Sequence, residues 1–286
     1  MAEVTELLAP RADGWYVDGT LGLGGHSEAL LEAGAGHIVG LDRDGEALAV
    51  ARDRLARWGD RMTTVHADYR TLPQVLDELG RPTVDGVLVD LGVSSLQLDA
   101  PERGFSFRHD GPLDMRMDRS AGQTLAERLA DVDEVTLADV IFRFGEERKS
   151  RRVARAIVEA WRGQPPATTG ELAAIVRRAV GGGWQRVDPA TRTFQALRIW
   201  VNRELDGLEA FLEAAVGRLA VGGRMAVIAF HSLEDRVVKH TWRRLAQGDA
   251  AVFRLVTRRP MVPGEAEAAA NPRSRSARLR VVERVA

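Results

Sequence analysis

The chain has 286 residues, of which 45% are hydrophobic and 28% are charged, and its formal net charge is −1. Whole-chain charge therefore indicates no particular partner, so a nucleic acid would have to bind a local basic patch. The absence of cysteine excludes disulfides, thiolate metal sites and cysteine nucleophiles, and no apolar run reaches the 18 residues of a membrane helix. We expect a soluble, cytoplasmic protein, with no metal.

The stretch 15–26, WYVDGTLGLGGH, joins a short apolar run to a glycine-rich turn and a helix-like segment that opens at His26. A strand, a glycine turn and a helix in this order bring the backbone close to a nucleotide-like ligand. Glycines lack a Cβ atom, so the turn can adopt positive φ and let a ligand lie against the main chain. The glycines concerned are Gly22, Gly24 and Gly25. An ordinary tight loop is the alternative, and the segments that follow favour a binding site.

Acids follow three further apolar runs, which predict parallel strands over 37–41, 62–65 and 84–91. Asp42 lies twenty residues beyond Gly22, a spacing at which a carboxylate can accept both hydroxyls of a ribose. The alternative role for Asp42 is to begin the next helix, for which Asp44 is available. Asp90 stands at the end of the third run, which is nearly all apolar, as expected for a strand covered on both faces.

Asp68 and Tyr69 follow the middle run, where they could bracket an adenine. A helix cap at Asp68 and core packing of Tyr69 explain that segment almost as well. Residues 92–118 then show no clean period, and a loop of this length is usually functional or disordered. Its phenylalanines and methionines argue against disorder, so we expect an ordered wall of the site.

From 119 to 190 the apolar spacing becomes helical, which predicts a small inserted domain with a glycine-rich break at 181–183. Thr136 with Asp139, and Thr168 with Glu171, are the expected helix caps. The run at 148–152, RKSRR, followed by Arg155, is the densest basic segment of the chain. A solvated helix face and RNA phosphate contact are its two interpretations.

The remaining sequence returns to strand and helix patterns. We expect a long helix over 194–218, a buried strand over 224–230, another helix to about 246, and a final strand pair at 252–256 and 279–282. The domains are thus predicted as 1–118 and 191–286, forming one α/β sheet domain, with 119–190 inserted between them.

The pattern of acid and glycines favours S-adenosylmethionine over a dinucleotide. Asp18 precedes the glycines, where a carboxylate would repel a pyrophosphate but suit a ligand with a cationic end. No Gly-Lys-Ser/Thr occurs, and Gly24-Gly25-His26 departs from the dinucleotide spacing. An antiparallel last strand also fits a methyltransferase better than a dehydrogenase.

Five stretches closely resemble the RsmH (MraW) family of bacterial 16S ribosomal RNA cytosine-N4 methyltransferases. They are YVDGTLGLGGHS at 16–27, DGVLVDLGVSSLQLDAPERGFSFRHDGPLDMRMD at 85–118, PATRTFQALRIWVN at 189–202, FHSLEDR at 230–236 and NPRSRSA at 271–277. The resemblance implies a class I S-adenosylmethionine-dependent methyltransferase (Rossmann-like) fold with an inserted helical domain that recognises substrate. The implied substrate is the exocyclic N4 of a cytidine in the decoding region of the small ribosomal subunit.

Carried over by position, the resemblance implies cofactor contacts at Gly24, Gly25, His26, Asp42, Tyr69, Asp90 and Gln97. The candidate substrate contacts are Phe105, Arg148, Arg151, Arg152, His231, Arg273 and Arg275, although core packing explains the phenylalanine equally well. Two departures stand out: the His-x-Pro-Val segment common near the family's N-terminus is absent, and Asp188 stands where the family often has histidine. The first bears on an N-terminal lid, and the second at most on substrate contacts.

The expected reaction is an in-line displacement at the sulfonium methyl, in which positioning supplies much of the rate. Asp90 is either the acceptor of the N4 proton or a cofactor ligand; the ligand role is favoured, and no general base is assigned. The alternatives are a methyltransferase for a protein or small molecule, a non-catalytic RNA-binding protein and, third, a nicotinamide dehydrogenase. Naked RNA and the assembled subunit both remain open as substrates, and a homodimer is one candidate for the oligomeric state.

Overall fold

The computed structural model describes residues 1–181, 187–248 and 251–286. They form two compact units, which we call unit 1, Met1–Gly92 with Leu205–Ala286, and unit 2, Val93–Glu204. None of the helices in these ranges is both long and apolar enough to cross a membrane. Of the glycine-rich break expected at 181–183, only Gly181 lies within the described residues.

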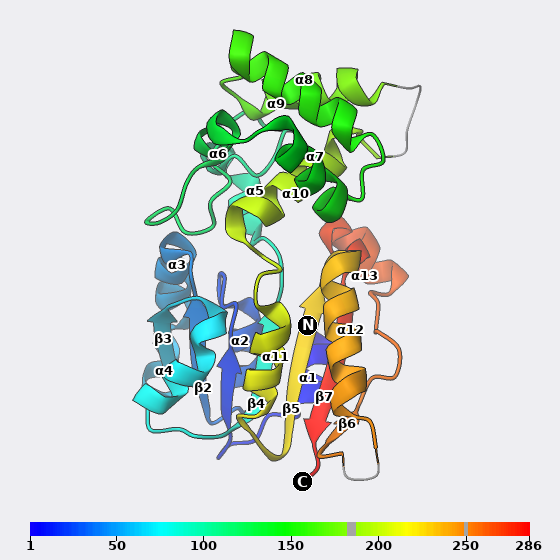
Figure 1. The fold of residues 1–286 in the computed structure, drawn as a ribbon. Coiled ribbons are helices and arrows are strands. Elements are labelled where there is room, and N and C mark those ends of the chain that lie inside the picture. The colour runs from blue at the N-terminus through cyan, green and yellow to red at the C-terminus, as the bar shows by residue number, and fades with distance from the viewer. Residues whose placement is uncertain (182–186, 249–250) are drawn as a thin grey trace. The chain divides into compact units, whose positions relative to one another are not determined.

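Unit 1 is built on a seven-stranded sheet with the order β3-β2-β1-β4-β5-β7-β6 (Figure 1). The strands are β1 Trp15–Asp18, β2 His37–Asp42, β3 Met62–His66, β4 Val84–Asp90, β5 Leu219–Ala229, β6 Phe253–Leu255 and β7 Arg278–Arg284. The first five run parallel, whereas β7 pairs antiparallel with both β5 and β6. The α/β class predicted from the sequence, including the antiparallel last strand pair, is confirmed.

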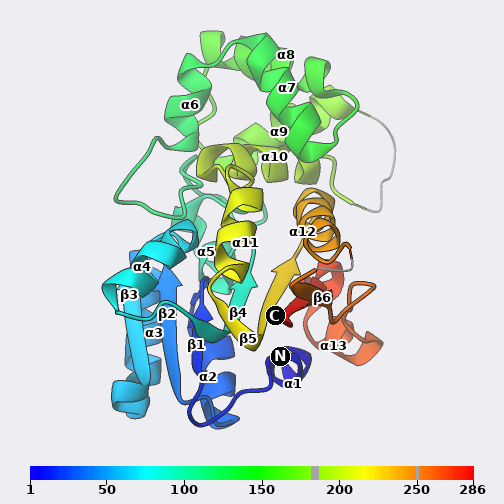
Figure 2. The same cartoon turned by 60° about the horizontal axis from the view of Figure 1, so that its bottom comes forward.

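Helices cover both faces of this sheet (Figures 1 and 2). In unit 1 they are α1 Ala2–Leu8, α2 Gly25–Glu32, α3 Gly45–Leu55, α4 Leu72–Glu78, α11 Leu208–Val216, α12 Ser232–Leu245 and α13 Glu265–Ala270. Side chains of β4 alternate between the two layers: Val87 and Val89 belong to the core shared with α4, α11 and α12, and Leu88 to the core shared with α1, α2 and α3. All three are fully buried, which explains the continuous apolar run of this strand.

Unit 2 is helical and has its own hydrophobic core. Its helices are α5 Ser95–Asp99, α6 Leu125–Asp131, α7 Glu134–Gly145, α8 Ser150–Gly163, α9 Thr169–Val180 and α10 Ala190–Asn202. The segment expected as a loop over 92–118 is ordered and contains α5. Arg103, which is fully buried, donates hydrogen bonds to the carbonyls of Arg116 and Met117, and Asp110 accepts one from the Gly170 amide at 2.8 Å.

The prediction of a single helix over 194–218 is wrong, because α10 ends at Asn202 and α11 begins at Leu208. Arg203 and Gly207 adopt positive φ, at 51° and 67°, and this conformation ends one helix and precedes the next. The apolar residues of the two helices have nearly the same spacing, so the pattern alone concealed the break.

One of the two expected caps is also wrong. Asp133, rather than Thr136, caps α7, since its carboxylate accepts hydrogen bonds from the amides of Val135 and Thr136. The expected cap at Thr168 is confirmed, because its hydroxyl accepts from the Glu171 amide at the start of α9.

The unit boundaries differ from the expected 118 and 190. Leu113 and Met115 pack in the core of unit 2, as do Phe194 and Leu197 of α10. These contacts place 93–118 and 191–204 with the helical unit, although both segments border sheet sequence.

Asn202 fastens the 113–117 segment to α10. Its Oδ1 accepts from the Met117 amide and its Nδ2 donates to the Met115 carbonyl, both at 2.7 Å. Asn202→Ala would leave buried backbone groups without partners, so we expect it to lower the free energy of unfolding by about 2–3 kcal/mol, measured by urea denaturation. Gln164→Ala, at an exposed amide, is the control. A loss no larger than that of the control would contradict this role.

Candidate active site

Two carboxylates and a histidine gather where β1 and β4 end. Asp18 is the last residue of β1, Asp90 the last of β4, and His26 lies in the first turn of α2. The His26 Nε2 lies 3.5 Å from the Asp90 Oδ2. Burial lowers the pKa of His26, but hydrogen bonding and attraction by Asp90, with Asp18 adding to it, leave that pKa above its ordinary value. The cluster therefore favours positive charge.

Asp18 is only 1% exposed, and burial raises its pKa to about 6 against the pull of the nearby histidine. Its two oxygens accept from the Thr20 amide at 3.2 Å and from the Ser27 hydroxyl at 2.8 Å. A carboxylate this deeply buried is stable in its charged form only with such donors or with a cation beside it.

Asp90 supplies a buried acceptor that the protein leaves unsatisfied. Its Oδ1 is inaccessible to solvent and has no hydrogen-bond partner among the described residues. The Asp90 amide donates to the Thr20 hydroxyl at 2.6 Å, which ties the end of β4 to the turn after β1. An unsatisfied carboxylate oxygen beside a second buried carboxylate suits a ligand with a cationic or hydrogen-donating group.

The glycine turn has the conformation that the sequence predicted. Gly22 and Gly24 have φ of +52° and +79°, the left-handed region that favours glycine. Gly24 is the residue before α2, and a Cβ there would lie 2.8 Å from the Leu55 Cδ1. Both the backbone conformation and the packing of α3 therefore require glycine at position 24, whereas Gly25 adjoins more open space.

Asp42 holds this turn in place. One carboxylate oxygen accepts from the Gly22 amide at 2.6 Å and the other from the Asp44 amide at 2.8 Å. Each oxygen has a second lone pair, so both can still accept a hydrogen bond from a ligand. Burial raises the pKa of Asp42. The alternative role, capping the next helix, belongs to Asp44, whose side chain accepts from the amides of Glu46 and Ala47.

Tyr69 is buried and packs in the sheet core against Phe211, with ring centroids 4.7 Å apart. Burial raises the pKa of its phenol to about 12. Asp68 caps the short turn that follows β3, accepting from the Arg70 amide. A core tyrosine and a capping aspartate therefore describe the contacts of this pair, and an adenine contact at Tyr69 stays a prediction.

Gln97 and Phe105, two of the expected site residues in unit 2, have structural contacts there. Gln97 closes a capping box at the start of α5, with the Ser94 amide donating to its Oε1 at 3.0 Å. Phe105 is buried, and the neighbouring Phe107 packs edge-to-face on Phe194. Packing thus accounts for both phenylalanines.

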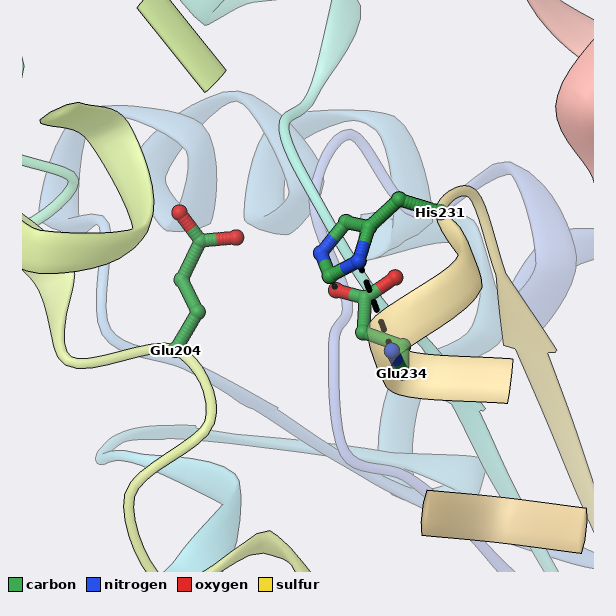
Figure 3. Close-up of side chains that lie close together, drawn as sticks. All are labelled: Glu204, His231 and Glu234. Carbon is green, nitrogen blue, oxygen red and sulfur yellow. Dashed lines mark hydrogen bonds and ion pairs between the residues drawn. The ribbon is translucent and has the colours of Figure 1, made fainter. Parts of the chain in front are cut away.

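His231 follows β5 and caps α12 (Figure 3). Its Nδ1 accepts from the Glu234 amide, and its Nε2 lies 3.0 Å from the Glu234 Oε1. The other carboxylate oxygen of Glu234 accepts from the Phe230 amide at 3.1 Å. The contacts between His231 and Glu234 fix the conformation of the chain just beyond β5, which pairs with β4.

The expected basic contacts lie on exposed surface. Arg148, Arg151 and Arg152 are exposed on unit 2, and Arg273 and Arg275 on unit 1. By contrast, Asp188, which stands in place of histidine, has a structural role: its carboxylate pairs with Arg177 at 2.9 Å and accepts from the Ala190 amide at the start of α10. The Arg177 guanidinium also draws the pKa of Asp188 downward.

Sequence reasoning missed Thr20 and Ser27, whose hydroxyls connect Asp90 and Asp18 to the turn. The available signal was local: both are hydroxyl residues that border the glycines. Nothing in their spacing distinguishes such roles from ordinary turn and helix-start positions.

Comparisons with known proteins bear on the family. The MraW methylase family model matches residues 1–285. A protein named ribosomal RNA small subunit methyltransferase H from Sorangium cellulosum is 53% identical over 287 residues, which cover 99% of this chain and 89% of that protein. One of the same name from Citrifermentans bemidjiense is 50% identical over 300 residues, covering 99% and 96%.

Among solved structures, an rRNA methylase from Streptococcus thermophilus aligns with 99% of this chain and 92% of its own, with a TM-score of 0.43 and 14% identity. A putative methyltransferase from Streptococcus mutans in complex with SAH gives 0.45 and 11%, covering 99% and 96%. These structural similarities are too weak to support an inference about chemistry. The family match and the sequence identities are decisive: the chain belongs to the MraW methylase family.

Proposed function

We propose that this protein methylates the exocyclic N4 of a cytidine in the decoding region of 16S ribosomal RNA in the small subunit, using S-adenosylmethionine. Relatives at about half identity are named as ribosomal RNA small subunit methyltransferases, which supports ribosomal RNA as the substrate. The base and its location come from the motif resemblance. The observation that carries the cofactor is the buried carboxylate of Asp18, together with the unsatisfied, buried Oδ1 of the half-buried Asp90, beside a glycine turn of positive φ.

The residues of unit 1 fit S-adenosylmethionine in charge and in hydrogen bonding. Asp18 and the unsatisfied Asp90 oxygen would face its cationic groups, and the free lone pairs of Asp42 would accept from the ribose hydroxyls. Gly24 and Gly25 would let the ligand approach the backbone, with His26 bordering them. Tyr69 and Gln97 complete the proposed contacts by resemblance.

When bound, S-adenosylmethionine supplies an electrophilic methyl group on its sulfonium. The protein's share is to orient this cation, to exclude water and to hold the accepting amine in line, because the lone pair of cytosine N4 is delocalised into the ring. Asp90 acts as a cofactor ligand in this proposal, and no residue is assigned as the general base. An unpaired or flipped cytosine fits this chemistry, since N4 must be reached outside a base pair.

The substrate contacts, the cellular location and the assembly are proposed as follows. Unit 2 recognises substrate, with Phe105, Arg148, Arg151 and Arg152 as candidate contacts, and unit 1 adds His231, Arg273 and Arg275. The cytoplasm as the location and a homodimer as the assembly remain predictions.

Methyl transfer from labelled S-adenosylmethionine to small subunits that lack the modification is the test, followed by nucleoside analysis. We expect label in N4-methylcytidine, and assaying free 16S RNA in parallel identifies the preferred substrate. Label in another nucleoside would contradict the assigned base. Cofactor binding without label in either RNA would contradict the RNA substrate and favour a methyltransferase that acts on protein.

A further inference from the structure

Helix α7 exposes two apolar side chains on one face. Val135 is 72% exposed and Phe142 is 57% exposed, and they lie seven residues, or about two helical turns, apart. The opposite face carries Leu137 and Ile141, which are fully buried in the core of unit 2. Among the described residues, no aromatic ring or guanidinium stacks on the Phe142 ring. The exposed Phe142 ring is therefore available to stack on a flat group of another molecule.

Arginines lie at both ends of this face. At the start of α7, the Arg155 Nε lies 3.3 Å from the carboxylate of Glu134, the residue before Val135. At its end, Arg192 donates to the Glu146 carbonyl at 3.4 Å, and the Glu146 amide in turn donates to the Phe142 carbonyl at 3.0 Å. These contacts place one guanidinium beside Glu134 at the start of α7 and another beside the Glu146 carbonyl at its end.

Helix α8 and the connection that leads into it add unpaired positive charge next to α7. Arg148, Arg151 and Arg152 are exposed and have no carboxylate partner within the described ranges. The chain passes from α7 to α8 through a tight connection, in which Glu146 has φ of 50° and the Glu147 carboxylate accepts from the Lys149 amide at 2.8 Å. Arg148 lies in this connection, and Arg151 and Arg152 lie in the first turn of α8.

We propose that this surface, formed by Phe142, Arg148, Arg151 and Arg152, docks single-stranded RNA, with a base stacked on Phe142. Free guanidiniums attract phosphates, and an exposed aromatic ring offers a platform that any unpaired base can use. A duplex offers no free base face to such a ring, so the surface discriminates in favour of unpaired segments. The inference rests on the proposed function, and it names the part of the substrate that unit 2 recognises.

The test compares four full-length variants with the wild-type protein. Phe142→Leu keeps an apolar side chain but removes the π face, Phe142→Tyr retains it, and Val135→Ala trims the neighbouring apolar residue. Arg151→Gln with Arg152→Gln removes two free charges. The probes are a 12-nucleotide single-stranded RNA, the same RNA as a duplex, and small subunits that lack the modification. The readouts are RNA affinity against salt, cofactor affinity, and kcat and KM on subunits.

We expect Phe142→Leu to weaken single-strand binding about 10-fold and to raise KM with kcat unchanged, while Phe142→Tyr and Val135→Ala remain near wild type. The double arginine variant should lower the slope of log affinity against log salt by about 1.4, because each phosphate contact on a single strand contributes about 0.7. Cofactor affinity should be unchanged in all four, because none of these residues contacts the acidic cluster. Wild-type binding to the duplex should be weaker than to the single strand.

Wild-type affinity of Phe142→Leu for the single strand would overturn the proposal, as would failure of the wild type to bind that RNA at low salt. Equal loss of subunit binding by Phe142→Leu and Val135→Ala, with oligonucleotide binding unchanged, would instead indicate a protein partner. If Phe142→Leu loses RNA affinity but the wild type transfers no methyl group to ribosomal RNA, the surface stands and the proposed function fails. Methylation of ribosomal RNA with the same kcat and KM in Phe142→Leu and the wild type would support the proposed function and overturn the docking surface.

Discussion

Asp18→Asn is expected to weaken S-adenosylmethionine binding about 10- to 100-fold while making the ligand-free protein more stable at pH 7. The affinity falls because a charge-assisted contact in a buried site contributes about 1.5–3 kcal/mol. The stability rises because ionised Asp18 is buried with only two donors, from Thr20 and Ser27. Asparagine keeps the shape and an acceptor oxygen but removes the buried charge.

The raised pKa of Asp18 also makes the free energy of unfolding depend on pH. Burial raises the pKa of Asp18 from its ordinary 3.8 to about 6, so the folded protein binds this proton more tightly than the unfolded chain does. The contribution to stability is therefore fully present below pH 4 and is lost as the pH rises through 6, a change of about 3 kcal/mol at most. Asp18→Asn should abolish this decline in the free energy of unfolding between pH 4 and 7.

Calorimetric titration of the cofactor and urea denaturation, both across that pH range, are the measurements. Wild-type affinity should decrease below pH 6, as Asp18 takes up a proton. Asp85→Asn is the control, since it makes the same charge change near the opposite end of β4, where Asp85 accepts from the Trp15 amide. Unchanged cofactor affinity in Asp18→Asn would remove Asp18 from the site.

Asp42→Ala is expected to reduce cofactor affinity more than 100-fold without unfolding the protein. The substitution removes the acceptor proposed for the ribose hydroxyls and also frees the amides of Gly22 and Asp44. The loss of these two turn contacts should lower the free energy of unfolding by about 1–3 kcal/mol. Equilibrium dialysis with labelled cofactor and thermal denaturation measure the two effects separately.

Asp44→Ala separates stability from binding. It removes the cap of α3, two residues away, which costs about 0.5–2 kcal/mol and leaves the Asp42 carboxylate in place. We expect near-normal cofactor affinity in this variant. If both variants lose affinity equally, then Asp42 acts only by shaping the turn.

Much of unit 1 could be predicted from the sequence because its signals are local. Strand β4 is buried on both faces, and it is recognisable as an apolar run of consecutive residues. The turn of positive φ is recognisable from its closely spaced glycines. The helix predicted over 194–218 was wrong because the signal for its break at 203–207 is not visible in the apolar pattern. There the break depends on two backbone conformations, at Arg203 and Gly207, while the apolar spacing continues through it.

For the candidate site, the sequence could predict only that acidic residues lie at the ends of neighbouring strands. Spacing indicated Asp42 and Asp90, but it could not show that Asp42 holds the Gly22 amide or that one Asp90 oxygen is buried without a partner. Such facts depend on packing between segments that are 20 residues apart for Gly22 and Asp42 and 70 residues apart for Thr20 and Asp90. In the same way, the substitution of Asp188 is explained by its partner Arg177 rather than by its position in the chain.

The division of the hydrophobic cores has a consequence for cooperativity. Within 1–181, 187–248 and 251–286, the core of unit 2 shares no member with the two cores that flank the sheet, and the chain enters and leaves that unit at 92–93 and 204–205. We therefore expect calorimetry to resolve two unfolding transitions, one for each unit, and a single two-state transition would contradict this expectation. By mass action, a ligand confined to unit 1 would move only one of the two heat-absorption peaks. Calorimetry would thereby reveal which unit a given ligand binds.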